Sequence, residues 1–246
     1  MDFYSFAPVS ALLDGAYTAV TALAALLTPA TGAASAAAAI VIITLLVRAA
    51  LIPVGISQVR AEFTRRRLAP KLQELQRKHK KNPELLQRKR MELYSAEKAS
   101  PLAGCLPTLA QAPVLSIVYG LFILGSINGH PNALLTDQLF GVPLGTSLVA
   151  SGLAWPNLAV FLVLLTLIAG VSWGSRAIAL RFAHATTDAT PPGLPNLSGA
   201  LSWLPFITVI FAALVPLAAT LYLTVTTAWT LAERIILRKA LAHKTT

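Results

Sequence analysis

The chain has 246 residues, of which 55% are hydrophobic and only 12% are charged, and its formal net charge is +10. So many apolar side chains exceed what the core of a soluble domain of this size requires, which excludes an ordinary soluble domain and indicates a protein folded in a lipid bilayer. The positive charge would suggest nucleic-acid binding in a soluble protein, so its position along the chain decides its meaning.

The first expected element is a helix within an external N-terminal segment, residues 1–32. Polar residues recur at near-helical spacing through residues 10–28, and Leu13, Tyr17 and Val20 begin an apolar stripe on the opposite side. This pattern predicts an amphipathic helix lying on the outer surface of the membrane, because a crossing would bury Asp14. A sixth crossing or an uncleaved signal segment is the alternative.

Long apolar stretches then predict five membrane spans, since a spanning helix needs roughly 20 mostly apolar residues. Residues 33–59 form the first span, 101–127 the second and 156–180 the third. Residues 199–237 are long enough for the fourth and fifth spans if the chain turns near Pro216. The connecting segments are 60–100, which is basic, an external loop at 128–155, a cytoplasmic loop at 181–198 and a cytoplasmic tail at 238–246.

The basic residues are concentrated on one predicted side of the membrane. Of the 20 Lys and Arg residues, 13 lie between Arg60 and Lys98, and none lies in residues 1–47 or 127–155. The positive-inside rule therefore places the N-terminus outside and the basic segment and C-terminus in the cytoplasm. A multi-pass protein of a bacterial plasma membrane is expected.

Residues 60–100 are predicted to form a cytoplasmic helical hairpin. Leu68, Leu72 and Leu75 mark an apolar stripe, and Asn82-Pro83 combines a residue that caps helices with one favoured at the first helical position. A disordered basic linker is the alternative. The hairpin residues expected to contact partners are Arg65, Arg66, Arg67, Lys80 and Lys81.

Arg48 is the candidate functional residue, because it is the only basic residue within the apolar body of a predicted span. An arginine at the centre of a helix costs about 2.5–3.5 kcal/mol on insertion scales, so it should face a polar cavity or a partner. Glu233 is expected near the end of its span, which leaves no acidic partner for Arg48. The alternative is an arginine that reaches the cytoplasmic headgroups with its long side chain.

Polar residues in the other predicted spans could build a groove around Arg48. Burying an amide or hydroxyl without a partner is costly, so such residues favour a hydrophilic environment. The residues assigned to this substrate-binding groove are Arg48, Gln111, Ser172, Tyr222 and Thr226.

Several short motifs resemble the YidC/Oxa/Alb family of membrane insertases. The most specific is the run Pro101-Leu102-Ala103-Gly104-Cys105-Leu106-Pro107, followed by Gln111-Ala112-Pro113, directly after a basic hairpin; Leu68-Ala69-Pro70 and Leu221-Tyr222 add to it. The resemblance implies an all-α polytopic membrane protein with five transmembrane helices around a hydrophilic groove that opens to the cytoplasm. Arg48 matches the family's groove arginine. Leu223, Thr227 and Glu233 depart from the family's Trp, Asn and Gln.

The expected function is to accept hydrophilic segments of nascent membrane proteins in the groove and to release their hydrophobic spans laterally into lipid. We expect no enzyme activity, cofactor or metal, and the Gly-x-x-x-x-Gly-Lys loop that would cradle ATP is absent from the sequence. The expected partners are nascent membrane proteins, the lipid bilayer, the ribosome, signal recognition targeting factors and the Sec translocon, with no specific nucleic acid. A small transporter or channel with Arg48 as an anion site is the main alternative. An intramembrane protease is a third reading, but it would need a Ser/His pair or two aspartates within its spans, and the sequence supports neither.

Overall fold

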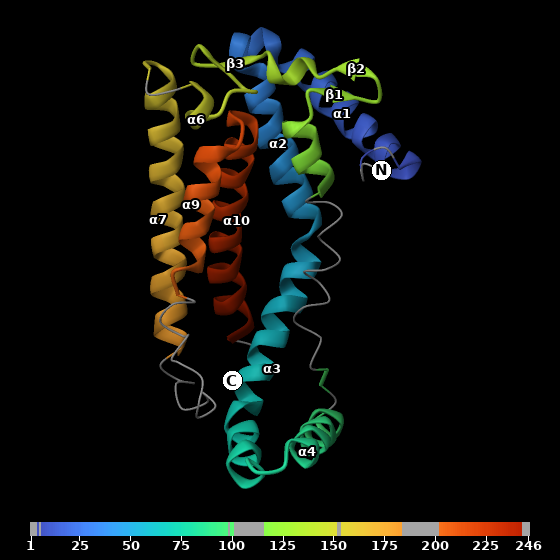
Figure 1. Ribbon diagram of the computed structural model, residues 1–246, viewed down its shortest axis with the longest axis vertical. Coiled ribbons are helices and arrows are strands. Elements are labelled where there is room, and N and C mark those ends of the chain that lie inside the picture. Colours follow the sequence, from blue (N-terminus) through green and yellow to red (C-terminus); the bar gives the residue numbers. More distant parts are fainter. Residues whose placement is uncertain are drawn as a thin grey trace.

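The computed structural model describes residues 4, 6–97, 99–100, 116–151, 154–183 and 202–242, and most of these are helical. Long helices run side by side, with a basic helical hairpin at one end and short strands at the other (Figure 1). Ala7–Ala50 and Asn157–Leu180 are long and apolar enough to cross a membrane, and Leu204–Leu214 is a shorter apolar helix. These helices fit the all-α membrane protein that the sequence predicts.

Helix α1, Ala7–Thr31, contains the predicted amphipathic segment and extends it at both ends. Its apolar stripe is present, since Leu13 and Val20 are almost completely buried. The stripe packs against other parts of the protein, mainly α2, Ser35–Ala50. Asp14 on α1 is paired with His130 at 3.0 Å, so this carboxylate has a protein partner that the sequence did not indicate.

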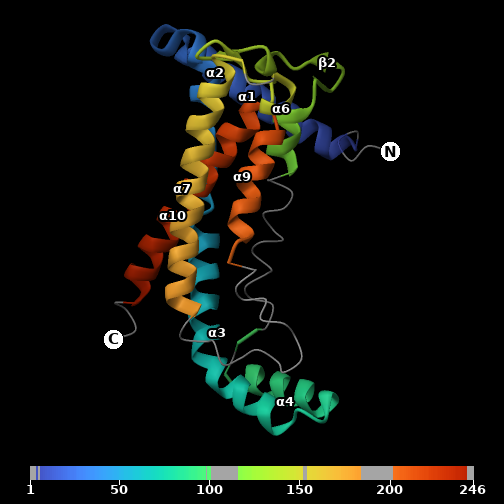
Figure 2. The same cartoon turned by 60° about the vertical axis from the view of Figure 1, so that its left-hand side comes forward.

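Helix α3, Ile52–Lys78, follows α2 after a single residue, Leu51. Pro53 has no N–H to donate to the preceding turn, which explains the interruption between two nearly continuous helices. Helix α3 therefore begins within the predicted first span and continues far into the basic segment. The next helix follows at the end of α3 that lies away from α2 (Figure 2).

Helix α4, Pro83–Ala96, begins where the sequence predicted. Asn82 caps it, since the Asn82 side-chain oxygen accepts a hydrogen bond from the Leu85 N–H at 3.0 Å. Glu97, just after α4, pairs with Lys71 and Arg67 of α3. Residues 60–97 thus form an ordered hairpin rather than a disordered linker.

The predicted external loop contains strands that the sequence analysis did not anticipate. β1, Ser126–Ile127, pairs with β2, His130–Pro131, and β3, Gln138–Leu139, pairs with β4, Val142–Pro143. Each turn has a non-glycine residue followed by glycine at positive φ, Asn128-Gly129 and Phe140-Gly141. Asn-Gly is a strong signal for such a hairpin turn, so the first pair could have been predicted. A 3₁₀ turn, Ala133–Leu135, and helix α6, Leu148–Ser151, complete the loop.

Helices α7, Asn157–Ala183, α9, Leu204–Leu214, and α10, Leu217–Ala242, form the rest of the bundle. The predicted turn near Pro216 is confirmed, since Val215 is extended and separates α9 from α10. The first N–H groups of α10 donate to the loop that carries the strands, from Leu217 to Thr146 O and from Ala218 to Leu144 O, both at 2.9 Å. Helix α10 continues into the expected tail at 238–246, as far as Ala242.

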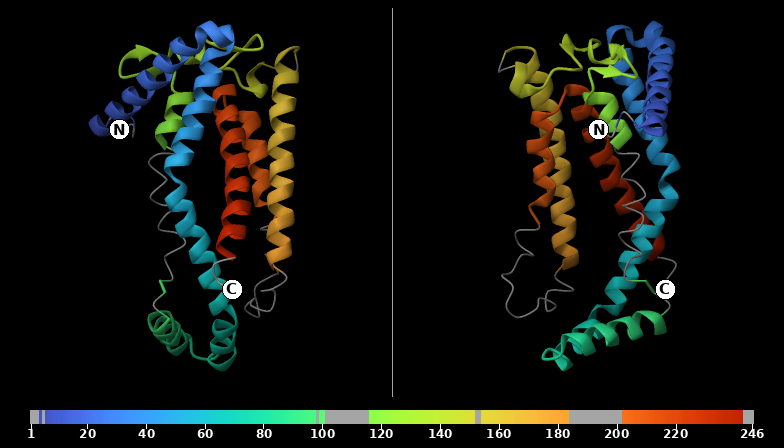
Figure 3. Two further views of the ribbon diagram at one scale, coloured as in Figure 1. Left: turned by 180° about the vertical axis from the view of Figure 1, so that it is seen from behind. Right: turned by 45° about the vertical axis from the view of Figure 1, so that its right-hand side comes forward.

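The largest packed core lies at the end of the molecule that carries α1 and the strands, opposite α4 (Figure 3). It joins α1, α2, the helix at residues 116–123, the loop, α7 and the start of α10. Asn132 is buried beneath it and donates from its amide to the carbonyls of Leu121 and Leu124, at 2.8 and 2.9 Å. This end of the bundle is therefore closed by side-chain packing.

Candidate functional site: a polar cavity between α2, α3 and α10

A cavity of about 480 Å³ lies where the end of α2 and the start of α3 pass the second half of α10. Helix α10 packs along both α2 and α3, which places residues from distant parts of the sequence around the cavity. The lining residues are Arg48, Leu51, Gly55, Gln58, Val59, Glu62, Arg65, Thr230, Glu233, Arg234, Leu237 and Arg238.

The cavity is rich in charge. Arg48, Arg65, Arg234 and Arg238 contribute four cations, while Glu62 and Glu233 contribute two anions, so the lining has an excess of two positive charges. A partly enclosed space with such a lining attracts anionic groups and favours polar ones.

Arg48 lies in the last turn of α2 and is half-buried. Its guanidinium has no hydrogen bond or ion pair within 4.0 Å among the residues that the structure describes. Glu233 lines the same cavity. The expectation that no acidic residue comes near Arg48 is therefore wrong, because α10 runs alongside α2 and α3 and carries Glu233 into the cavity.

Glu233 is held on the cavity wall by two neighbours. The Trp229 indole N–H donates to Glu233 Oε2 at 2.9 Å, one turn earlier in α10. Gly55 of α3 leaves room for the carboxylate, since a methyl group at Gly55 would overlap Glu233 Oε1. The position of the Glu233 carboxylate thus depends on the glycine, because a larger residue would displace this side chain.

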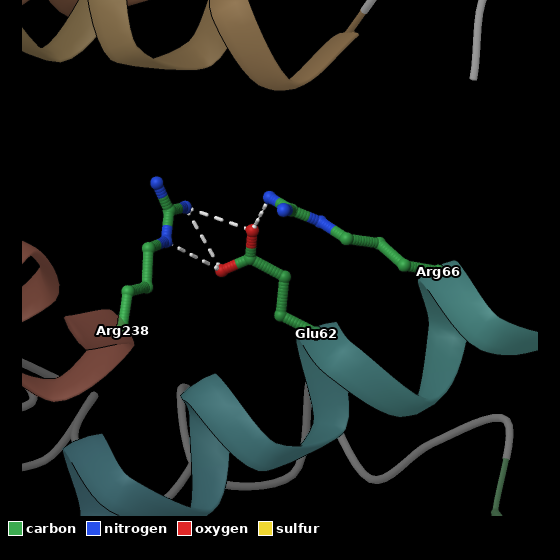
Figure 4. A network of polar contacts seen from close by, with 3 residues as sticks. All are labelled: Glu62, Arg66 and Arg238. Carbon is green, nitrogen blue, oxygen red and sulfur yellow. Dashed lines mark hydrogen bonds and ion pairs between the residues drawn. The ribbon is translucent and has the colours of Figure 1, made fainter. Parts of the chain in front are cut away.

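The hairpin end of the cavity is bordered by an ion-pair network between α3 and α10 (Figure 4). Arg238 Nη2 lies 2.8 Å from Glu62 Oε1 and 2.9 Å from Glu62 Oε2, and Arg238 Nε lies 3.3 Å from Glu62 Oε2. Arg66, one turn further along α3, also pairs with Glu62. Glu62 is thus shared by two arginines, and it joins the two helices.

These cavity residues all fall within the match to a known family. The family model described as 60Kd inner membrane protein matches residues 26–244. The chain belongs to this family, the YidC/Oxa/Alb insertases.

Individual relatives agree with that assignment. The membrane protein insertase YidC of Clostridium perfringens is 35% identical over 115 residues, which cover 47% of this chain and 48% of the relative. The inner membrane ALBINO3-like protein 2 of Chlamydomonas reinhardtii is 30% identical over 195 residues, 73% of this chain and 44% of the relative. The inner membrane protein ALBINO3 of Arabidopsis thaliana is 31% identical over 218 residues, which cover 80% of this chain and 45% of the relative. The chain spans about half the length of the curated relatives it matches.

The structure brings only some of the predicted groove residues to this cavity. Arg48 lines it, whereas Gln111 lies outside the described residues. Ser172 is buried between α7 and α9, and its hydroxyl donates to Pro205 O at 3.1 Å. Tyr222 is buried in the core, with its ring 6.1 Å from that of Phe122.

Thr226 lies one turn of α10 away from the cavity. Its hydroxyl is buried with no hydrogen-bond partner in the described part of the chain, and its carbonyl accepts from the Thr230 hydroxyl at 2.8 Å. Thr230 lines the cavity, so the predicted polar face of α10 continues along the helix from Thr226.

The predicted hairpin residues occupy three different environments. Arg65 lines the cavity, and Arg66 pairs with Glu62. Arg67 pairs with Glu97 at 3.2 Å, which ties α3 to α4. The exposed side chains of Lys80 and Lys81 lie at the hairpin turn.

Sequence reasoning missed most of the α3 and α10 lining, although a signal was present. Gly55, Gln58, Glu62 and Arg65 recur at intervals of three or four residues on α3. Thr230, Glu233, Arg234, Leu237 and Arg238 do the same on α10. Such spacing places each set on one face of its helix, and charges of both signs on both faces indicate that the faces meet.

Proposed function

We propose that the protein is a membrane protein insertase whose polar cavity accepts hydrophilic segments of nascent membrane proteins. The observation that carries the proposal is the excess of two positive charges, Arg48 included, in a cavity formed where apolar α2 continues into basic α3. Family membership and the name of the Clostridium perfringens relative support it.

The physical basis is the cost of moving polar groups through hydrocarbon. An unsatisfied backbone group costs several kcal/mol there, and a charge costs more. Arginines and a glutamine along the cavity can bond such groups during passage, while the apolar span of the client moves sideways into lipid. No covalent chemistry is required.

In the proposed architecture, five transmembrane helices surround a groove that opens to the cytoplasm, with the N-terminus outside. The packed core at the strand end and the cavity towards the hairpin end support this polarity. A bacterial plasma membrane fits the positive-inside pattern, although the relatives include chloroplast proteins.

The hairpin is the proposed contact surface for further partners. Lys80 and Lys81 at its turn are exposed, which suits anionic lipid headgroups or ribosomal RNA phosphates. Targeting factors and the Sec translocon are partners that the function would involve. The transporter or channel alternative is not favoured, since the relatives described above that carry a functional name are insertases.

The test is insertion into liposomes of one single-span client, with either aspartates or asparagines in its translocated segment. Arg48→Ala should reduce insertion of the acidic client on the order of fivefold, as expected for a partly solvated charge pair worth about 1 kcal/mol. Arg48→Lys should retain part of the activity, because it keeps the charge but loses the planar guanidinium. The neutral client should be much less affected. Equal insertion of the acidic client by the wild type and Arg48→Ala would contradict the proposed mechanism.

A further inference from the structure

We infer that Glu233 is an internal competitor for Arg48, which limits how tightly the cavity holds the carboxylates of a client. The inference rests on the proposed insertase function, and it assigns to Glu233 the control of client release. Glu233 acts here as a positioning residue, through the charge of Arg48.

The first support is that the Glu233 carboxylate is fixed in place. Trp229 donates to one carboxylate oxygen, and Gly55 of the facing helix accommodates the other. That second oxygen, Oε1, is buried and has no hydrogen-bond partner among the residues described. A buried carboxylate oxygen without a donor is unfavourable, and a nearby positive charge compensates for it.

The second support is that Arg48 and Glu233 share the cavity without forming a direct ion pair. Both line it, and no contact within 4.0 Å joins Glu233 to Arg48 or Arg234 in the described structure. An ion pair in contact would occupy the guanidinium, whereas a separated anion only lowers the positive potential around it. Arg48 thus stays available to a ligand.

The consequence concerns the balance between capture and release. A client carboxylate that enters the cavity adds an anion to a space that already contains Glu62 and Glu233. Glu233 competes with that carboxylate for the Arg48 guanidinium, and so it opposes part of the attraction. A client is therefore captured by a net positive lining but is not trapped by it.

The experiment uses the full chain in liposomes, with a photoreactive residue at Gln58, which is uncharged and lines the cavity. The probe is the single-span client in its aspartate and asparagine versions. Glu233→Gln keeps an acceptor for Trp229 and should prolong crosslinking to the acidic client on the order of threefold, with little change for the neutral client. Glu92→Gln on exposed α4 removes the same charge far from the cavity and should change neither.

The double variant Arg48→Ala/Glu233→Gln separates this role from a structural one. If Glu233 acts through Arg48, its replacement has no effect on acidic clients in the Arg48→Ala background. Prolonged crosslinking that persists there, or that appears with both clients, would overturn the inference. So would an unchanged crosslink in Glu233→Gln when Arg48→Ala does impair the acidic client. If Arg48→Ala alone leaves insertion of the acidic client unchanged, the result would instead count against the proposed function.

Discussion

Glu62 and Arg238 are 176 residues apart in the sequence, yet their side chains form a two-point ion pair with contacts of 2.8 and 2.9 Å. The pair connects α3 to α10 beside the polar cavity and lies on the side nearest the hairpin. It is partly shielded, since the Arg238 side chain is only 14% exposed. This carboxylate therefore helps to hold the two helices together at the hairpin end.

Replacing Arg238 should let α3 and α10 separate at this end. Arg238→Gln removes the three contacts to Glu62 and should lower the free energy of unfolding by about 1 kcal/mol, in the range of partly exposed ion pairs. Spin labels on the two helices should report a longer and broader distance distribution. Lys239→Gln, which removes the same charge from the next, exposed residue, is the control and should leave the distance unchanged. Equal distances in both variants would mean that packing alone holds the helices.

The attachment of α4 to α3 should depend on pH through Glu97. Lys71, by hydrogen bonding and by its charge, holds the pKa of the Glu97 carboxyl below its usual value. A lowered carboxyl pKa stabilises the folded arrangement above the ordinary pKa, and that contribution is lost as the pH falls through the lowered value. Fluorescence energy transfer between α3 and α4 should therefore decrease on acidification. Glu97→Gln should remove this dependence, whereas Glu92→Gln should keep it because Glu92 pairs within α4.

The start of α4 should depend on its cap. Asn82→Ala removes the acceptor for the Leu85 N–H and should destabilise the first turn by about 1 kcal/mol. Hydrogen exchange at Leu85 and Leu86 should become faster. Lys81→Ala, a neighbouring exposed residue without a capping role, serves as the control, and matching exchange in the two variants would count against the cap.

Local signals were sufficient to predict several features of this fold. Asn82-Pro83 contains its own capping chemistry, and Val215-Pro216 stops a helix wherever it occurs, so both boundaries followed from neighbouring residues. Arg48 was recognisable because a charge within an apolar stretch is costly. These features need no knowledge of how the helices pack.

Features that depend on packing could not be predicted in the same way. Glu233 was assigned to the end of a span, because its proximity to Gly55 and Arg48 arises only when α10 lies against α2 and α3. Ser172 was assigned to the groove by polarity alone, yet a serine on an apolar helix is equally satisfied by a neighbouring carbonyl. Helix length misled as well, since α3 and α10 both run past the predicted limits of the apolar spans.

The proposed orientation can be tested by labelling single cysteines in a Cys105→Ser background. Val149, which is 67% exposed in the strand-end loop, should be labelled from outside when replaced by cysteine. Lys80 at the hairpin turn should be labelled only after permeabilisation. Asn132 in the same loop is a poor choice, because it is buried and bonded to two carbonyls. Labelling of both positions from the same side would rule out the proposed topology.

Ser172 allows a structural role to be distinguished from a role in the groove. Its hydroxyl donates to Pro205 O at 3.1 Å, near the start of α9, and this bond joins α7 to α9. Ser172→Ala removes this hydrogen bond and should lower the free energy of unfolding in detergent by about 1 kcal/mol. Insertion of acidic and neutral clients, corrected for the amount of folded protein, should remain unchanged.

The control is Thr166→Val, which removes a hydroxyl from an exposed position on the same helix and should leave stability nearly as it was. A polar residue that lined the client path would show the opposite pattern, with normal stability and impaired insertion. That outcome for Ser172→Ala would return Ser172 to the groove and would require the cavity to extend from α10 towards α7. Lost stability with normal insertion would instead limit the path to the side of α10 that faces α2 and α3, where Arg48 and Glu233 lie.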